Sequence, residues 1–231
     1  MKFVKVTLFL LMALSVFSTL SFASAFIDFG IIAPTPGSIS YAGGNSPLVG
    51  SNIQVDNVTG VGTALCNGCS FNILNGTLNF TTGAFTGSTS NTWNFGGGGS
   101  ISISGCVDVN MDGSCDSGDI SGLLMSGAFN FASVTAIGNT FKIAGSSFFD
   151  MKNPDLAALF GTTSGCGGAQ CEGNFNISFD ASGLPPSAFR STHVLSGDVV
   201  NNIVPEPASL ALLGTGLIGL GTLARRKLLG R

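Results

Sequence analysis

A segment in the middle of the chain has the residue types and the spacing of a cation site. It runs from Asp108 to Asp119, with side-chain oxygens at positions 1, 3, 5, 9 and 12 and a glycine at position 6, where such a loop turns sharply. Oxygens at this spacing can surround one Ca²⁺ ion, and Asp116 can do so directly or through water. The expected ligands are the side chains of Asp108, Asn110, Asp112, Asp116 and Asp119 and the backbone carbonyl of Ser114.

The pattern resembles the loops of dockerins and of thrombospondin type 3 repeats, extracellular calcium-binding families that accept Asp at the last position. Cys115 occupies position 8, where such loops usually carry an apolar residue, and no helix is predicted before Asp108. The resemblance therefore implies calcium binding rather than a dockerin's partner role. The alternative is an acidic, solvated turn held by Cys106 and Cys115, in which the carboxylates repel one another.

Six cysteines form three close pairs in sequence: Cys66 with Cys69, Cys106 with Cys115, and Cys166 with Cys171. An even number in an exported chain favours disulfides, and local pairing is the simplest of the possible connectivities. The C-x-x-C unit could also ligate zinc or exchange electrons. No second C-x-x-C completes a zinc ribbon, and the Asn67-Gly68 pair is typical of a two-residue hairpin turn.

Catalytic motifs are scarce. The single histidine, His193, stands alone, and no G-x-S-x-G, H-E-x-x-H or phosphate-binding G-x-x-x-x-G-K motif occurs. A carboxylate pair for glycoside hydrolysis would have to be assembled by the fold, with Asp150, Asp180 and Asp198 as candidates. The sequence therefore favours a protein that is not an enzyme.

The amino-terminal segment has the pattern of a secretory signal peptide. Lys2 and Lys5 precede an apolar run over residues 6–20, and the triplet Ala23-Ser24-Ala25 provides small residues for signal peptidase. We expect cleavage between Ala25 and Phe26, with cleavage after Ala23 as the alternative. Residues 1–25 are therefore predicted to be removed on export.

The carboxyl-terminal segment has three parts in a fixed order. The residues Val204, Pro205, Glu206 and Pro207 come first, an uncharged stretch over 208–223 follows, and Arg225, Arg226 and Lys227 close it. The uncharged stretch predicts a transmembrane helix over 208–224, and the basic tail over 225–231 should stay on the cytoplasmic side. The chain is thus expected to be held in the inner membrane by this helix.

The order and spacing of these parts resemble the PEP-CTERM sorting signal of Gram-negative bacteria. The resemblance implies recognition by an exosortase, a membrane protease thought to cut near the Pro-Glu-Pro, and then residence at the cell surface or in the extracellular matrix. It also implies an association with exopolysaccharide and biofilm. The alternative for residues 204–231 is a plain single-span anchor.

The elements that would position these residues are predicted to be β-strands over residues 26–203. Alternating apolar residues recur, as in Phe129-x-Phe131 and Phe175-x-Ile177-x-Phe179, and glycine-rich connectors at Gly83, Gly87, Gly96–Gly99, Gly145 and Gly183 separate them. We predict an all-β domain, an antiparallel β-sandwich of jelly-roll-like form, with a β-solenoid as the alternative. One short helix is expected over residues 154–160, between Asn153 as N-cap and Gly161 as C-terminal stop.

Charge narrows the choice of partners. Residues 26–204 hold three basic and eleven acidic side chains, hence a net charge of −8, which repels nucleic acid and anionic lipid. The leading prediction is a non-enzymatic surface or matrix protein. A carbohydrate-binding module is the alternative, although only Trp93 and Tyr41 could offer flat platforms for sugars, and a secreted hydrolase is the third class.

Overall fold

The computed structural model describes residues 25–138, 140–164, 172–183 and 185–202. The predicted signal peptide up to residue 24, the Cys166 and Cys171 pair, and the carboxyl-terminal segment from residue 203 lie outside these residues. Within the described part, no helix is both long and apolar enough to cross a membrane, and the span predicted at 208–224 falls outside it.

The described residues form β-strands and one short helix, which confirms the predicted all-β class. The strands are β1 (Phe26–Ile31), β2 (Ser38–Tyr41), β3 (Pro47–Gln54), β4 (Asn57–Val61), β5 (Ser70–Thr89), β6 (Thr92–Phe95), β7 (Gly98–Val107), β8 (Ile120–Ile137), β9 (Thr140–Lys152), β10 (Glu172–Ala181) and β11 (Phe189–Asn202). The helix is α2 (Pro154–Phe160).

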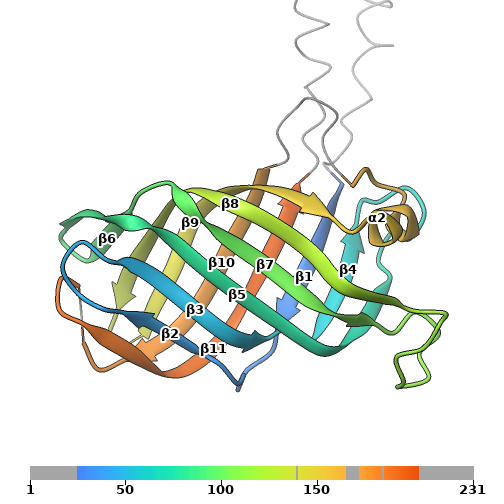
Figure 1. Cartoon of the computed structure of the whole chain (residues 1–231), viewed down its shortest axis with the longest axis horizontal. Helices are drawn as coiled ribbons and strands as arrows, with labels where there is room; N and C mark the ends of the chain where they lie inside the picture. The colour runs from blue at the N-terminus through green and yellow to red at the C-terminus, as the bar shows by residue number, and fades with distance from the viewer. Residues whose placement is uncertain (1–24, 139, 165–171, 184, 203–231) are drawn as a thin grey trace, which may run out of the picture.

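All strands belong to one antiparallel sheet of 11 strands. The order along it is β1-β4-β5-β3-β2-β11-β10-β9-β8-β6, with β7 between β5 and β8. The first and last strands of the domain, β1 and β11, also lie side by side (Figure 1). Their pairing places Phe26 opposite Asn202. The jelly-roll-like sandwich and the β-solenoid stay predictions.

The core consists of the inward-facing side chains of this sheet. Strand β10 shows the expected period of two, because Phe175, Ile177 and Phe179 are all buried while the residues between them are more exposed. The ring of Phe175 packs edge-to-face against the ring of Phe80 on β5, and the two ring centroids are 5.0 Å apart. Burying each such side chain contributes roughly 1.5–3 kcal/mol to folding.

Helix α2 begins and ends where the sequence predicts. The side chain of Asn153 accepts a hydrogen bond from the backbone N–H of Asp155 at 2.9 Å, and Gly161 adopts the left-handed conformation that ends the helix. The buried residues of α2 are Leu156, Ala157 and Phe160. Leu159 is only partly buried against the core.

The glycines expected as connectors do not all lie between strands, and this prediction is wrong for five of them. Gly83 and Gly87 lie inside β5, Gly98 and Gly99 are the first residues of β7, and Gly145 lies inside β9. At Gly83 a Cβ atom would come within 2.2 Å of the backbone oxygen of Gly97, so the glycine permits a close backbone approach rather than a turn. The strands are consequently longer than the glycine spacing suggests.

The alternation Phe129-x-Phe131 was also misleading. Phe129 is buried, but Phe131 is 48 % exposed. The register of β8 against β9 shifts on both sides of Phe131, and such a bulge turns the following side chain to the other face.

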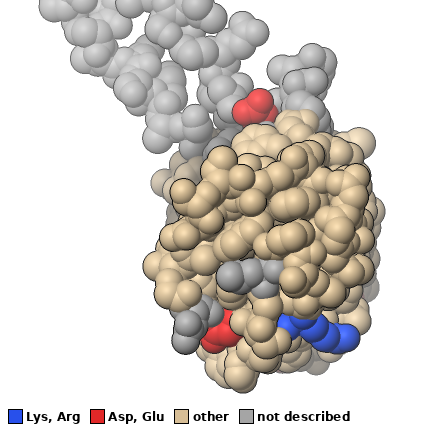
Figure 2. Space-filling model, turned by 90° about the vertical axis from the view of Figure 1, so that its left-hand side faces the viewer, with Lys and Arg blue, Asp and Glu red and all other residues tan. Residues whose placement is uncertain are grey.

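The described surface carries few charges. Figure 2 shows one face of the molecule on which uncharged residues predominate and charged ones are isolated. Of the two basic residues whose side chains the structure describes, Lys152 is buried and Arg190 is exposed. The buried one lies 3.6 Å from the carboxylate of Asp150, and burial lowers the pKa of its amine.

Candidate functional site

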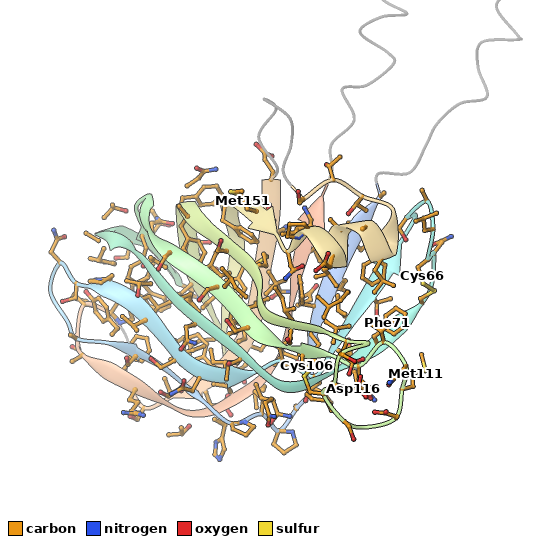
Figure 3. The ribbon with its side chains drawn as sticks, turned by 45° about the vertical axis from the view of Figure 1, so that its right-hand side comes forward. Cys66, Phe71, Cys106, Met111, Asp116 and Met151 are labelled. Atoms are coloured by element: carbon orange, nitrogen blue, oxygen red, sulfur yellow. A yellow bond between two sulfur atoms is a disulfide. The ribbon has the colours of Figure 1, made fainter. Side chains whose placement is uncertain are left out.

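The predicted calcium loop is the connection between β7 and β8. Val107 and Ile120 are paired across these two strands, so the twelve residues from Asp108 to Asp119 form the whole of the hairpin connection. The loop projects from the sheet, with Met111 at its outer part and Asp116 near Cys106 (Figure 3). Because Val107 and Ile120 are paired, the distance between the first and last residues of the loop is fixed.

The first ligand position lies at the centre of the loop's hydrogen bonds. Asp108 is 2 % exposed, and its Oδ1 and Oδ2 accept the backbone N–H groups of Asp112 (3.1 Å) and Gly113 (2.9 Å). Gly113 has a φ of 79°, which glycine adopts at little cost, and this is the sharp turn expected at position 6. The chain therefore wraps around the Asp108 carboxylate.

The third and fifth positions continue this pattern. Asn110 Oδ1 also accepts the N–H of Asp112, at 3.1 Å, and Oδ1 of Asp112 accepts the N–H of Ser114 at 2.8 Å. The amide Nδ2 of Asn110 donates to Oδ2 of Asp112 at 3.1 Å. These bonds tie the side chains of positions 1, 3 and 5 to the backbone of residues 112–114.

The last position closes the loop. Asp119 Oδ1 accepts the N–H of Val109 at 2.9 Å, and its Oδ2 accepts the N–H of Asp116 at 3.0 Å. These bonds lower the pKa of the Asp119 carboxyl, chiefly through the bond from Asp116, and outweigh the opposite effect of burial. Asp119 is thus ionised at neutral pH. Asp116 Oδ1 accepts the N–H of Gly118 at 2.9 Å.

The predicted bridge between Cys106 and Cys115 is present, with the two Cα atoms 6.1 Å apart. It ties position 8 of the loop to β7. Together with Asp119 these cysteines form a cluster of potential metal-ligating atoms within 4.8 Å of one another. The sulfurs offer no thiolate for a metal because they are bonded to each other. A metal in this region would therefore be bound by oxygens.

The donors of the loop suit a hard cation. Each carboxylate oxygen described above accepts at least one hydrogen bond, and an ionised carboxylate offers about four lone-pair sites in total. Calcium takes six to eight oxygen ligands in a flexible geometry, and carboxylate, amide and carbonyl oxygens are all present here. The residues at the predicted positions therefore fit a Ca²⁺ ion chemically.

The second described cysteine pair, Cys66 and Cys69, is also a disulfide, with Cα atoms 5.3 Å apart. A turn at Asn67-Gly68 joins the two cysteines, as predicted, but it is not a two-residue hairpin connection. Strand β4 ends at Val61 and β5 begins at Ser70, so the bridge lies within a longer loop. The predicted bridge between Cys166 and Cys171 stays a prediction.

The fold does not bring together the carboxylates considered for glycoside hydrolysis. Asp150 is buried beside Lys152. Asp198 is paired with Asn176, whereas Asp180 lies four residues further along β10, opposite the exposed His193. Four residues of a strand span about 13 Å, beyond the separation that either glycosidase mechanism uses.

A pair of carboxylates that sequence reasoning missed lies on β1 and β11. Asp28 faces Val200 across the two strands and Asp198 faces Gly30, so the two aspartates are diagonal neighbours on one face. Asp28 Oδ1 is buried without a hydrogen-bond partner. Burial, and to a lesser extent the charge of Asp198, raises the pKa of Asp28 to about 6. Only the pairing of the first and last strands reveals this contact.

This contact predicts a loss of stability as the pH rises. The folded-state pKa of Asp28, about 6, exceeds the unfolded value of roughly 3.9, so ionisation opposes folding from about pH 4 upward and does so fully above about pH 6. Because Asp28 is half exposed, we expect Asp28→Asn to raise the free energy of unfolding by only about 1 kcal/mol at pH 7.5, with little change at pH 3.5. Urea unfolding at both pH values measures this, and an equal effect at the two values would contradict it.

Comparison with known proteins gives one match. Residues 204–227 match the PEP-CTERM protein-sorting motif, which confirms the resemblance seen in the sequence. No curated protein and no solved structure matches the chain. The chain therefore carries the sorting signal of an exosortase substrate, which implies export, membrane anchoring before processing and an extracellular location afterwards.

Proposed function

We propose that the processed domain is a non-enzymatic component of the cell surface or extracellular matrix, associated with exopolysaccharide or biofilm. The observation that carries the proposal is the sorting motif at residues 204–227. An exosortase is then the processing partner at the carboxyl terminus, and signal peptidase removes residues 1–25. The domain needs no catalytic site for this role, because the role is structural: the domain binds to the matrix and stays in it.

The surface chemistry supports a polysaccharide rather than a nucleic acid as partner. The net charge of −8 over residues 26–204 repels phosphate backbones. Hydroxyl and amide side chains alternate along the outward face of β10 and β4, where Asn174, Asn176, Asn57 and Thr59 are at least partly exposed. Such side chains exchange hydrogen bonds with sugar hydroxyls.

A carbohydrate-binding module with a stacking platform has less support. The chain has one Trp and one Tyr, and Trp93 is 6 % and Tyr41 only 2 % exposed. Neither ring presents a flat face to solvent. Contacts with sugars would thus be polar and individually weak. Many such contacts, made with successive units of a polymer, would together retain the protein in the matrix.

The β7–β8 loop favours a second function, the binding of Ca²⁺. Asp108, Asn110, Asp112, Asp116 and Asp119 would hold the ion with their side chains, together with the backbone carbonyl of Ser114. The support is the convergence of the loop's hydrogen bonds on Asp108 and the closure of the loop by Asp119. Calcium would replace the mutual repulsion of four carboxylates by attraction to one divalent charge.

The matrix role predicts that processed protein sediments with exopolysaccharide from the producing cells. Most of the protein should move to the pellet as polymer is added, and no single defined oligosaccharide on a glycan array should compete efficiently. Saturable binding to one glycan would favour the carbohydrate-binding module, and shortening of the polymer would favour a hydrolase. Protein that stays in the supernatant at every polymer concentration would contradict the proposal.

A further inference from the structure

Both membrane-directed segments of the precursor leave the domain at the same end. Phe26, the first residue of β1, is paired with Asn202, the last residue of β11. The predicted signal peptide ends directly before Phe26, and the first residue of the predicted membrane span, Ala208, comes only six residues after Asn202. An extended chain of six residues reaches at most about 20 Å, so this end must stay close to the bilayer while the tail is attached.

The same end carries three exposed apolar side chains. Val61 on β4 is paired with Phe26. On β10, Glu172 is paired with Asn202 on one side and with Phe149 of β9 on the other. Met151 lies two residues after Phe149, at the same end of the sheet. Leu65 is placed there by the hydrogen bond from its N–H to the carbonyl of Phe160 in α2. We name Val61, Leu65 and Met151 the apolar rim, and they are 38 %, 73 % and 67 % exposed.

Figure 3 shows two parts of this end, with Met151 near α2 and Cys66, the neighbour of Leu65, on the other side of that helix. Two acidic residues, Asp155 and Glu172, are exposed nearby. Neither described basic side chain is exposed there, because Lys152 is buried and Arg190 lies at the opposite end of β11. A bilayer contact of the rim would accordingly depend on apolar side chains and not on anionic lipid.

We propose that the apolar rim rests in the surface of the bilayer while the domain is tail-anchored, and that it becomes free when the tail is cut. The proposal rests on the membrane-anchored precursor of the proposed function. Large exposed apolar side chains beside a membrane attachment point gain free energy by entering the interface. The contact would fix the orientation of the domain on the membrane, so that Pro205–Pro207, near which the exosortase is expected to cut, stays at the bilayer surface.

The test is lipid quenching of tryptophan in the full-length precursor reconstituted into phosphatidylcholine vesicles. Leu65→Trp and Met151→Trp report on the rim, and Ile137→Trp is the matched control. Ile137 is 63 % exposed and lies at the turn of the β8–β9 hairpin, near Asp180 at the far end of β10. The ten residues of β10 span about 30 Å between the two ends. Trp93 is common to all variants and gives the baseline.

Lipids brominated near the top of the acyl chains should quench the two rim tryptophans several-fold more than the Ile137→Trp control. Adding anionic lipid should not increase the effect, and an increase would overturn the apolar basis of the contact. If the precursor floats with the vesicles but all three tryptophans are quenched alike, the rim proposal is wrong while tail anchoring stands. If the precursor does not float with the vesicles, the anchored state itself is wrong, and both proposals fail.

Discussion

Cells that produce the variant Pro205→Ala, Glu206→Ala, Pro207→Ala should keep the protein in the membrane fraction, whereas wild-type protein should be released from it. The substitutions leave the uncharged stretch from residue 208 and the basic residues Arg225, Arg226 and Lys227 intact. Insertion and orientation therefore survive, and only recognition by the exosortase is lost. The expected effect is close to all-or-none and is measured by comparing the membrane and released fractions on immunoblots.

A matched control replaces three residues outside the sorting motif. The motif ends at residue 227, so Leu228→Ala, Leu229→Ala, Gly230→Ala should be released like wild type. Recognition of the Pro-Glu-Pro by an exosortase requires the two triple variants to behave differently. If the two triple variants are released to the same extent, residues 204–227 either act as a plain anchor or are not recognised by an exosortase.

Calcium should raise the thermal midpoint of the domain, and Asp112→Asn should abolish most of this response. We expect a dissociation constant of roughly 10⁻⁴ to 10⁻³ M, as in other extracellular modules. A free calcium concentration a hundred times the dissociation constant stabilises the folded state by about 2.7 kcal/mol, since the ion binds the folded loop only. For a domain of this size that corresponds to a shift of roughly 5–10 °C.

Differential scanning calorimetry of processed protein, with chelator, magnesium or calcium, provides the measurement. Magnesium should have a much smaller effect because it requires a compact octahedral shell and retains its water. Asp155→Asn in α2 is the control, since it removes one carboxylate that is not part of the loop and should leave the calcium response unchanged. If calcium does not change the thermal midpoint, or changes it equally in Asp112→Asn, the calcium proposal is wrong. The loop is then an acidic turn held by Cys106 and Cys115 that binds no ion.

Local features of the fold were predictable because their causes lie within a few residues. Asn153, Pro154 and Gly161 define α2 through capping and backbone geometry, which act over one helical turn. Strand β10 was likewise predictable, because buried and more exposed residues alternate along it without interruption. Phe131 was not, since its exposure depends on a bulge that forms only against β9.

The long-range pairings had no signal in the sequence. Glycines inside β5 and β9 look like turn residues, yet Gly83 is required by the close approach of Gly97, a contact that exists only in the folded sheet. The pairing of Phe26 with Asn202 joins the two ends of the domain. It creates both the contact between Asp28 and Asp198 and the common exit of the two membrane-directed segments, so neither could be foreseen.

The candidate calcium loop lies between these extremes. Its ligand spacing is local, and the structure places the loop between the paired residues Val107 and Ile120, with hydrogen bonds around Asp108. The oxygen positions could thus be predicted, whereas the strand hairpin that holds them could not. The occupancy of the loop by calcium stays a proposal for the calorimetric test.

The intact mass of the protein that wild-type cells release tests processing at the sorting motif most directly. Processing at both ends predicts a released chain that begins at Phe26, ends near Pro205–Pro207 and lacks residues 208–231. Cleavage after Ala23 would shift only the amino terminus and would leave the account standing. A released protein whose mass still includes Arg225, Arg226 and Lys227 would contradict it, because processing at the sorting motif would then not have occurred.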